Sequence, residues 1–415
     1  MSAVPGVMEV AERLWTGELS TADRHPLAAA LQQLEEVDPG VAFVSSFANV
    51  TAFDTPAGLV LVDVGSHLFA NTVHELVHGW SSHALHTAIY THGHVDHVFG
   101  VPRWEADAGV AARVVAHEAV PARFDRYRLT AGWNARINAR QFGVAGGMTW
   151  PTDYRYPDVT YRDTVDLDVG GVRFVLRHDR GETDDHTWVW VPERRILCTG
   201  DLFIWASPNC GNPQKVQRYP RDWARALRAM DQLGAELLCP GHGWPIRGDD
   251  RIHRALTETA ELLETLHDQT VALMNAGARL DDVLHTVRAP AHLLERPYLR
   301  PVYDEPEFIV RNVWRLYGGW WDGNPAHLKP APERAVATEL VALAGGAGRL
   351  ADRALALAAD GDLALACHLV ELAAQAAPAD DAIRAARRDV YARRAKVERS
   401  TMARGVYRAA STDDD

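Results

Sequence analysis

The stretch Thr91-His92-Gly93-His94-Val95-Asp96-His97 follows the short apolar run Ala88–Tyr90 and decides how this sequence of 415 residues is interpreted. If the run is a strand, the loop leaving it brings alternate side chains together. His92 and His94 can then hold one metal ion, while Asp96 and His97 turn toward a second. Imidazole and carboxylate ligands suit zinc and similar divalent metals. The pattern is too specific to favour an ordinary histidine-rich surface loop.

Three later positions offer further ligands, each next to a glycine or threonine near the end of an apolar run: Glu182, Asp201 and His242. Functional side chains of sheet proteins gather where strands end. A lone aspartate after a strand is more often a helix cap. The order of the histidine loop, Thr199-Gly200-Asp201 and Pro240-Gly241-His242 nevertheless predicts that Asp201 is a ligand. His186 remains a rival of Glu182, and His178 is a weaker one.

The composition is that of a globular protein, with 47% apolar and 24% charged residues. The net charge of −12 and the absence of a basic run argue against nucleic acid as a partner. The four cysteines form no C-x-x-C pair, which is typical of a reducing compartment. We find no signal-peptide pattern and no apolar window long enough to span a bilayer, so a cytoplasmic protein without membrane contact is expected.

The predicted secondary structure changes near residue 250. Before it, apolar runs predict strands at Val41–Ser45, Leu59–Val64, Ala88–Thr91, Val172–Leu176, Thr187–Val191 and Arg195–Thr199. After it, helical spacing predicts helices at Arg254–Asn275, Asp281–Val287, Glu307–Tyr317, Leu350–Ala359, Asp362–Ala376 and Asp380–Val397. We therefore expect an α/β catalytic domain over 1–250, an all-α domain over 251–410 and a frayed tail at 411–415.

Together the histidine loop, Glu182, the Thr-Gly-Asp string and the Pro-Gly-His string resemble the metallo-β-lactamase superfamily over about residues 40–250. The resemblance implies a four-layered αββα sandwich that holds two divalent metals, most commonly zinc. It also implies the distribution of the ligands. His92, His94 and Glu182 would hold the first ion, Asp96, His97 and His242 the second, and Asp201 would bridge them.

A glutamate at position 182, 19 residues before Asp201, is similar to the alkyl sulfatase branch of that superfamily. The strings Tyr303–Glu307 and Arg315–Pro325 also resemble the start of the alkyl sulfatase dimerisation domain. This resemblance implies a homodimer formed through the helical domain and hydrolysis of a small sulfate ester. A water shared by two metals ionises near neutral pH and attacks the ester, with Asp96 and Asp201 in catalytic roles.

Several positions depart from the alkyl sulfatase pattern. The family commonly has a glutamate where this chain has Asp201. It also has an asparagine followed by an arginine-containing string that binds sulfate. Here Asn209 matches the asparagine, and Lys215 or Arg218 would have to replace the arginine. A lysine does not reproduce the bidentate fork of an arginine.

The sequence also ends before the lipid-carrier-like domain of longer family members. These departures leave open a lactone, thioester or phosphoester as substrate, a redox-active iron centre, or a metal-stabilised dimer without catalysis.

A polar segment at 133–143 is a further candidate for substrate binding. Asn134, Asn138 and Gln141 fall near one face of a predicted helix, and Arg136 and Arg140 lie four residues apart. A similar helix contributes to the pocket in the sulfatase family, so Asn134 and Arg140 join Asn209 and Lys215 as predicted substrate contacts. The alternative is a solvated helix whose arginines pair with nearby acids.

Overall fold

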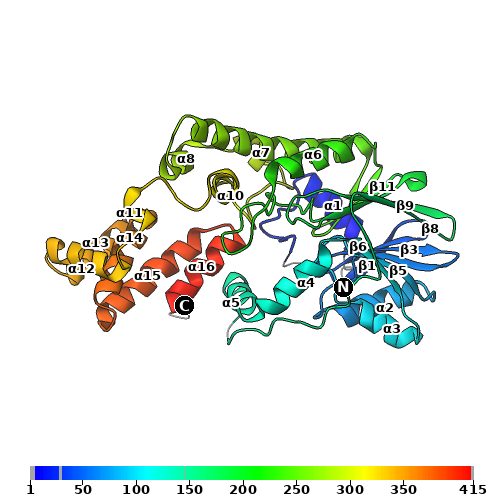
Figure 1. Cartoon of the computed structure of the whole chain (residues 1–415), viewed down its shortest axis with the longest axis horizontal. Helices are drawn as coiled ribbons and strands as arrows, with labels where there is room; N and C mark the ends of the chain where they lie inside the picture. The colour runs from blue at the N-terminus through cyan, green and yellow to red at the C-terminus, as the bar shows by residue number, and fades with distance from the viewer. Residues whose placement is uncertain (1–4, 28–29, 145, 413–415) are drawn as a thin grey trace. The chain divides into compact units, whose positions relative to one another are not determined.

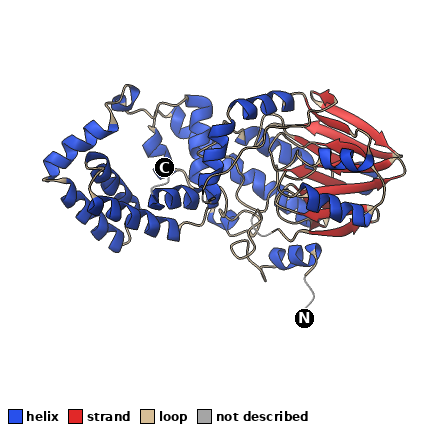
Figure 2. Ribbon diagram, turned by 90° about the horizontal axis from the view of Figure 1, so that it is seen from below, coloured by secondary structure: helices blue, strands red, loops and turns tan. Residues whose placement is uncertain are grey.

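The protein is described by a computed structural model for residues 5–27, 30–144 and 146–412. Two β-sheets form the centre of its N-terminal part (Figures 1 and 2). The first sheet has the order β1-β2-β3-β4-β5-β6-β7, and the second has the order β13-β12-β11-β10-β9-β8. Neighbouring strands run parallel from β4 to β7 and between β11 and β12, and antiparallel elsewhere.

The strands of the first sheet are β1 (Gln33–Asp38), β2 (Val41–Ser45), β3 (Val50–Thr55), β4 (Gly58–Val62), β5 (Leu85–Ile89), β6 (Arg113–His117) and β7 (Val159–Tyr161). Those of the second are β8 (Thr164–Val169), β9 (Val172–His178), β10 (Thr187–Val191), β11 (Ile196–Gly200), β12 (Leu237–Pro240) and β13 (Ile246–Arg247). A single 3₁₀ turn, Pro192–Arg194, joins β10 to β11, which pair as an antiparallel hairpin.

The helices up to the end of the sheet region are α1 (Val7–Trp15), α2 (Ala70–Trp80), α3 (Val101–Ala108), α4 (Val120–Leu129), α5 (Ala131–Phe142) and α6 (Pro220–Asp231). Those that follow are α7 (Asp249–Asn275), α8 (Leu280–Thr286), α9 (Ala291–Leu294), α10 (Pro306–Gly318), α11 (Pro325–Leu328), α12 (Glu333–Ala344), α13 (Ala347–Ala359), α14 (Leu363–Ala376), α15 (Asp381–Val397) and α16 (Thr401–Thr412).

The two sheets pack face to face through alternate apolar side chains, as the period of a strand requires. Phe53 of β3 meets Phe174 of β9 edge-on, with ring centroids 5.1 Å apart. Helices α2 and α3 contact the first sheet, and α6 and α7 cover the second. The predicted four-layered αββα sandwich is confirmed.

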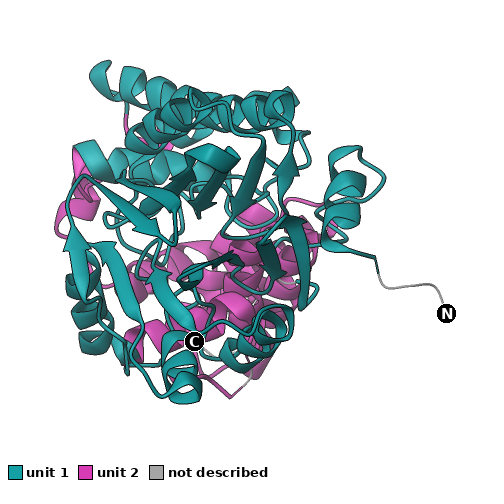
Figure 3. Cartoon of the chain, turned by 90° about the vertical axis from the view of Figure 1, so that its right-hand side faces the viewer, with its two compact units in different colours: residues 1–131, 150–278, 283–317 teal, residues 132–149, 279–282, 318–415 magenta. Residues whose placement is uncertain are grey.

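The chain divides into two compact units, which Figure 3 colours separately. Unit 1 comprises residues 1–131, 150–278 and 283–317, and unit 2 comprises 132–149, 279–282 and 318–415. This division differs from the boundary expected at 250. Helices α7 and α10 belong with the sheets because Leu256, Leu263 and Ile309 are buried in the same apolar core as the strands.

Unit 2 is helical, and α13, α14 and α15 form a small apolar core of their own around Ala354, Val370 and Val390. The expected frayed tail is wrong at residues 411 and 412, which continue α16, while 413–415 lie outside the described residues. In the part of the chain that the structure describes, no helix is both long and apolar enough to cross a membrane.

Candidate metal centre

Loops at the ends of four strands carry the seven predicted ligands, all within unit 1. The loop after β5 holds His92 to His97, and the β9–β10 connection holds Glu182. Asp201 directly follows β11, and His242 follows β12. Because β11 and β12 are parallel neighbours paired at Gly200 and Pro240, their ends place Asp201 and His242 side by side.

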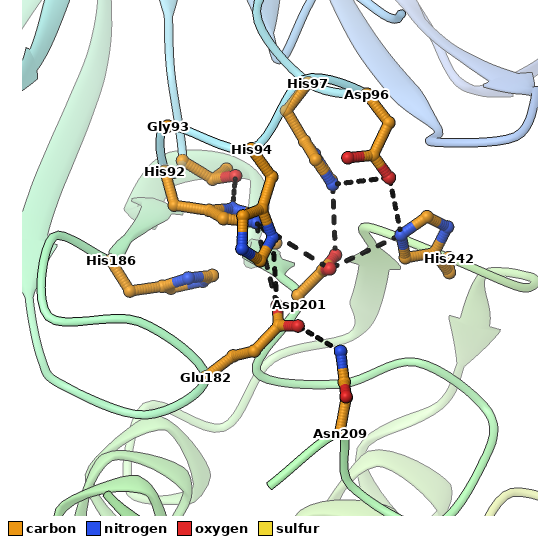
Figure 4. A network of polar contacts seen from close by, with 12 residues as sticks. His92, Gly93, His94, Asp96, His97, Glu182, His186, Asp201, Asn209 and His242 are labelled. Carbon is orange, nitrogen blue, oxygen red and sulfur yellow. Dashed lines mark hydrogen bonds and ion pairs between the residues drawn. The ribbon is translucent and has the colours of Figure 1, made fainter. Parts of the chain in front are cut away.

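The first cluster contains His92, His94, Glu182 and Asp201 (Figure 4). Nε2 of His92 and Nδ1 of His94 lie 2.8 Å apart, and each is 3.7 Å from Oε2 of Glu182. Nε2 of His92 is also 3.8 Å from Oδ2 of Asp201. An ion with four tetrahedral bonds of about 2.1 Å separates its ligand atoms by about 3.4 Å. The spacing of the cluster is therefore suited to one divalent ion.

The second cluster contains Asp96, His97 and His242. Nε2 of His242 lies 3.4 Å from Oδ2 of Asp96 and 3.3 Å from Oδ2 of Asp201. Nε2 of His97 lies 3.6 Å from Oδ2 of Asp96 and 3.4 Å from Oδ1 of Asp201. Asp201 thus stands between the two clusters, where a bridging carboxylate is expected.

The hydrogen bonds made by Nδ1 of His97 and of His242 leave Nε2 of each ring available to bind a metal. Nδ1 of His97 bonds to Oδ2 of Asp63 at 2.7 Å, and Nδ1 of His242 bonds to the carbonyl oxygen of Phe47. Such bonds fix the tautomer and direct Nε2 toward an ion. Nε2 of His97, Oε2 of Glu182 and Oδ1 of Asp201 are buried without a hydrogen-bond partner. Buried polar atoms normally have a bonding partner, so these three atoms are suited to bind metal ions.

Electrostatics divide the four histidines into two pairs. Burial, with neighbouring cationic groups, holds the pKa of His92 and His94 well below the usual value. Burial acts in the same direction on His97 and His242. At these two histidines the neighbouring carboxylates, with Asp201 the foremost, raise the pKa by more than burial lowers it. The pKa of His97 is therefore raised, and that of His242 reaches about 10. A divalent ion would replace the protons that the carboxylates attract to this second pair.

Glycine is required where the strand ends approach each other. A Cβ on Gly241 would lie 2.1 Å from Oδ1 of Asp201, and a Cβ on Gly200 would lie 2.8 Å from Nε2 of His186. Gly200 also has a φ of +51°, in the left-handed region that favours glycine. Gly241 therefore makes room for the carboxylate between the clusters, and Gly200 makes room for His186 and Thr91.

Comparison with known proteins identifies the parts of the chain. Residues 45–242 match the metallo-beta-lactamase superfamily, and residues 279–414 match the family described as alkyl sulfatase dimerisation. The chain carries a metallo-beta-lactamase domain followed by an alkyl sulfatase dimerisation domain. Both resemblances inferred from the sequence are confirmed. The superfamily match and the two side-chain clusters indicate binding of divalent metal.

Several curated proteins to which the chain is similar are alkylsulfatases. It is 27% identical over 318 residues to a linear primary-alkylsulfatase of a Pseudomonas species, covering 71% of this chain and 60% of that protein. It is 26% identical to an (R)-specific secondary-alkylsulfatase of Pseudomonas over 91% of the chain and 60% of the relative. The alkyl/aryl-sulfatase BDS1 of Saccharomyces cerevisiae is 27% identical over 74% of the chain and 52% of its own length. The chain thus spans little more than half of these relatives.

A solved structure has a similar fold. The stereoselective inverting sec-alkylsulfatase Pisa1 from Pseudomonas superposes with a TM-score of 0.83 at 25% identity, over 91% of this chain and 65% of that one. This likeness covers the metallo-beta-lactamase domain and the helices that follow it.

Two polar side chains of the metallo-beta-lactamase domain contact Glu182 opposite the histidines. Nη1 of Arg218 lies 2.6 Å from Oε1 of Glu182, and Nδ2 of Asn209 donates to the same oxygen. These contacts leave Oε2 facing His92 and His94. The rival ligand His186 instead directs Nε2 to the carbonyl oxygen of Thr199 at 3.1 Å and stacks on His92. It belongs to neither cluster in the described residues.

The predicted substrate contacts are found in different places. Asn209 lies at the first cluster, where it contacts Glu182. Lys215 is half-buried, with its ammonium 5.8 Å from the Trp150 ring centroid. Asn134 and Arg140 lie on α5 within unit 2, so the structure does not group them with the ligands of unit 1. The alternative of a solvated helix is wrong for Asn134, which is buried.

Two polar residues of the site were missed by sequence reasoning. Asp63 follows β4 with a φ of +58° and accepts from the backbone N–H and hydroxyl of Thr91 as well as facing His97. Its signal was a polar residue directly after a buried strand. Arg123 of α4 pairs with Asp185, whose carboxylate also accepts from the N–H of Gly93 in the histidine loop. The pairing of Arg123 with Asp185 cannot be anticipated from the sequence, because the two residues are 62 positions apart.

Replacing Asp63 by alanine is expected to weaken metal binding by about 10- to 100-fold, because His97 loses the acceptor that fixes its tautomer. Metal content after dialysis against a graded chelator measures the loss. Asp54→Ala is the matched control, since Asp54 pairs with the exposed His83 away from both clusters. Equal metal retention by the two variants would show that Asp63 does not position a ligand.

Proposed function

We propose that the protein is a metal-dependent hydrolase that cleaves a sulfate ester at a centre of two divalent ions. The observation that carries the proposal is the convergence of two ligand clusters on the two oxygens of Asp201. In this assignment His92, His94 and Glu182 hold one ion, while Asp96, His97 and His242 hold the other. The alkylsulfatase names of the relatives support the ester class.

Two bound ions, zinc in the simplest case, would make water a nucleophile at neutral pH and polarise the ester oxygens. The residues of this chain supply the rest of the chemistry. Asp201 would offer one carboxylate oxygen to each group of ligands, and Asp96, whose Oδ2 lies 3.4 Å from Nε2 of His242, would orient the attacking water. Burial tends to raise the pKa of Asp96, but His97 and His242 outweigh it, so that the pKa is lowered and the carboxylate stays ionised and accepts hydrogen bonds rather than donating them.

The sulfate group requires a cationic contact beyond the ions. Arg218 already pairs with Glu182, so in this proposal Lys215 is the cation that contacts the sulfate group. The carboxylates of Asp96 and Glu182 are close enough to act on the pKa of Lys215. Burial and Arg218 together lower that pKa to about 7. The Lys215 ammonium is therefore charged below about pH 7 and increasingly neutral above it.

Lys215→Met is expected to raise KM for an alkyl sulfate about tenfold while changing kcat less, because one charge-assisted contact contributes about 1.5–3 kcal/mol. In the wild type KM should rise as the pH passes upward through 7. Lys215→Arg should restore binding and remove this rise, since arginine stays protonated. Steady-state kinetics between pH 6 and about 8.5 measure both effects. A pH-independent KM in the wild type would eliminate Lys215 as the anion contact.

The proposal is tested by assaying the zinc-loaded protein against short alkyl sulfates, phosphoesters, lactones and thioesters. Turnover of a sulfate ester should disappear on metal removal and return with zinc, and His94→Ala should lose metal and turnover together. His253→Ala is the control, because His253 is an exposed histidine paired with Asp231. Activity that survives without metal would overturn the proposal. Faster turnover of a lactone, thioester or phosphoester would keep the centre and replace the substrate.

We also propose that the alkyl sulfatase dimerisation domain joins two copies of the chain. In the Arg315–Pro325 string, Trp320 is 72% exposed and Trp321 is 39% exposed. Exposed tryptophans of this kind are common in the buried part of protein interfaces. A monomer in light scattering at micromolar concentration would contradict the dimer.

A further inference from the structure

A second group of potential ligands lies outside the candidate centre, on the helices that cover the first sheet. His74 and His78 are one turn apart on α2, and Asp107 is in the last turn of α3. One ligand atom from each residue falls within 4.8 Å of the other two. Nε2 of His74 is 3.3 Å from Oδ2 of Asp107, which is close to the separation of two ligands on one zinc ion.

The environment of His74 requires an explanation. Its side chain is only about 4% exposed, yet neither ring nitrogen makes a hydrogen bond. One face of the ring packs on Trp104, with centroids 4.4 Å apart, and His78 stacks in parallel at 5.6 Å. Buried imidazoles normally have at least one partner, because an unsatisfied polar group is costly. Valine or leucine would fill this position between α2 and the Trp104 ring without that cost.

We propose that His74, His78 and Asp107 form a third divalent-metal site, separate from the candidate centre and suited to zinc. Two imidazoles and one carboxylate are a ligand set for such ions. His78 is exposed and Asp107 is 42% exposed, so an ion can enter from solvent and keep water in its remaining coordination positions.

One neighbouring charge opposes an ion at this site. Nη1 of Arg103 lies 3.5 Å from Oδ1 of Asp107. The other carboxylate oxygen, Oδ2, faces His74 and remains for the metal. The third site should therefore bind zinc more weakly than the candidate centre, and Arg103→Ala should tighten it.

A metal at this position would connect α2 to α3. Helix α3 begins at Val101, four residues after His97, and the residue before it, Gly100, packs against the chain at Val64. An ion that joins the two helices would therefore stabilise the layer behind the histidine loop. It would add stability that grows logarithmically with the free zinc concentration above its Kd, and it would take no part in the reaction.

The test is zinc content per chain in the full-length protein at micromolar free zinc. Wild type is expected to hold one more zinc than His78→Ala or Asp107→Asn, and both variants should keep the turnover of the wild type. His78 and Asp107 are on the surface, so these variants avoid the disruption expected from replacing the buried His74. His253→Ala, which removes a paired histidine without a third ligand nearby, should keep the full zinc content.

The same zinc content in wild type, His78→Ala and Asp107→Asn would overturn the third site. So would an unchanged zinc affinity in Arg103→Ala. The comparison does not depend on the proposed hydrolase. If the candidate centre binds no metal or has no activity, the difference of one zinc between wild type and His78→Ala is still expected.

Discussion

Asp201→Asn is expected to reduce kcat/KM by at least about 10³-fold and to lower the metal content of the protein. Oδ1 of Asp201 faces His97, and Oδ2 faces both His92 and His242. An amide has nearly the same shape, but it carries no charge and has only one oxygen. It cannot bridge two ions, so both are expected to bind more weakly.

The measurement combines metal analysis with steady-state kinetics on an alkyl sulfate. Asp166→Asn is the control: Asp166 lies in the same domain, but its carboxylate pairs with Arg173 at the exposed surface. That variant should be indistinguishable from wild type. Normal turnover by Asp201→Asn with two bound ions would show that this carboxylate is not the bridge.

Above about pH 8, where Glu182 is ionised, Arg218→Met is expected to destabilise the metal-free protein by about 3–5 kcal/mol, because it leaves the carboxylate of Glu182 buried without its cation. Both side chains are almost fully inaccessible, at 3% and 1% exposure, and their charged atoms are 2.6 Å apart. Burial already raises the pKa of Glu182 to about 8 in the presence of Arg218. Saturation with a divalent ion should restore part of the lost free energy of unfolding, since the ion gives Glu182 a positive partner in place of Arg218.

Urea unfolding of the metal-free and zinc-loaded forms measures the effect. Arg228→Met is the matched control, because Arg228 forms an ion pair of 2.7 Å with Glu264 while both side chains are about 40% exposed. Loss of this exposed ion pair should lower the free energy of unfolding by less than about 1 kcal/mol. Equal destabilisation by the two variants would show that the buried pair has no special role at Glu182.

Local pattern in the sequence was enough to predict several of the strands and helices and to name the candidate ligands. Residues Val41–Ser45 and Thr187–Val191 are strands with the predicted bounds, because continuous β-branched and aromatic runs bounded by turns suit buried strands. The seven candidate ligands could be named because each follows a strand, and strand ends of a sandwich meet at one edge. They do converge, with neighbouring ligand atoms less than 4 Å apart.

Tertiary structure decided what depends on contacts between distant segments. The pairing of Glu182 with Arg218 and of His97 with Asp63 joins residues 36 and 34 positions apart. Neither pairing follows from a local period. The same reason explains why α7 and α10 pack with the sheets and why α5 belongs to unit 2. A sequence determines which side chains a strand or helix offers, but the partner that each one meets depends on how the layers pack.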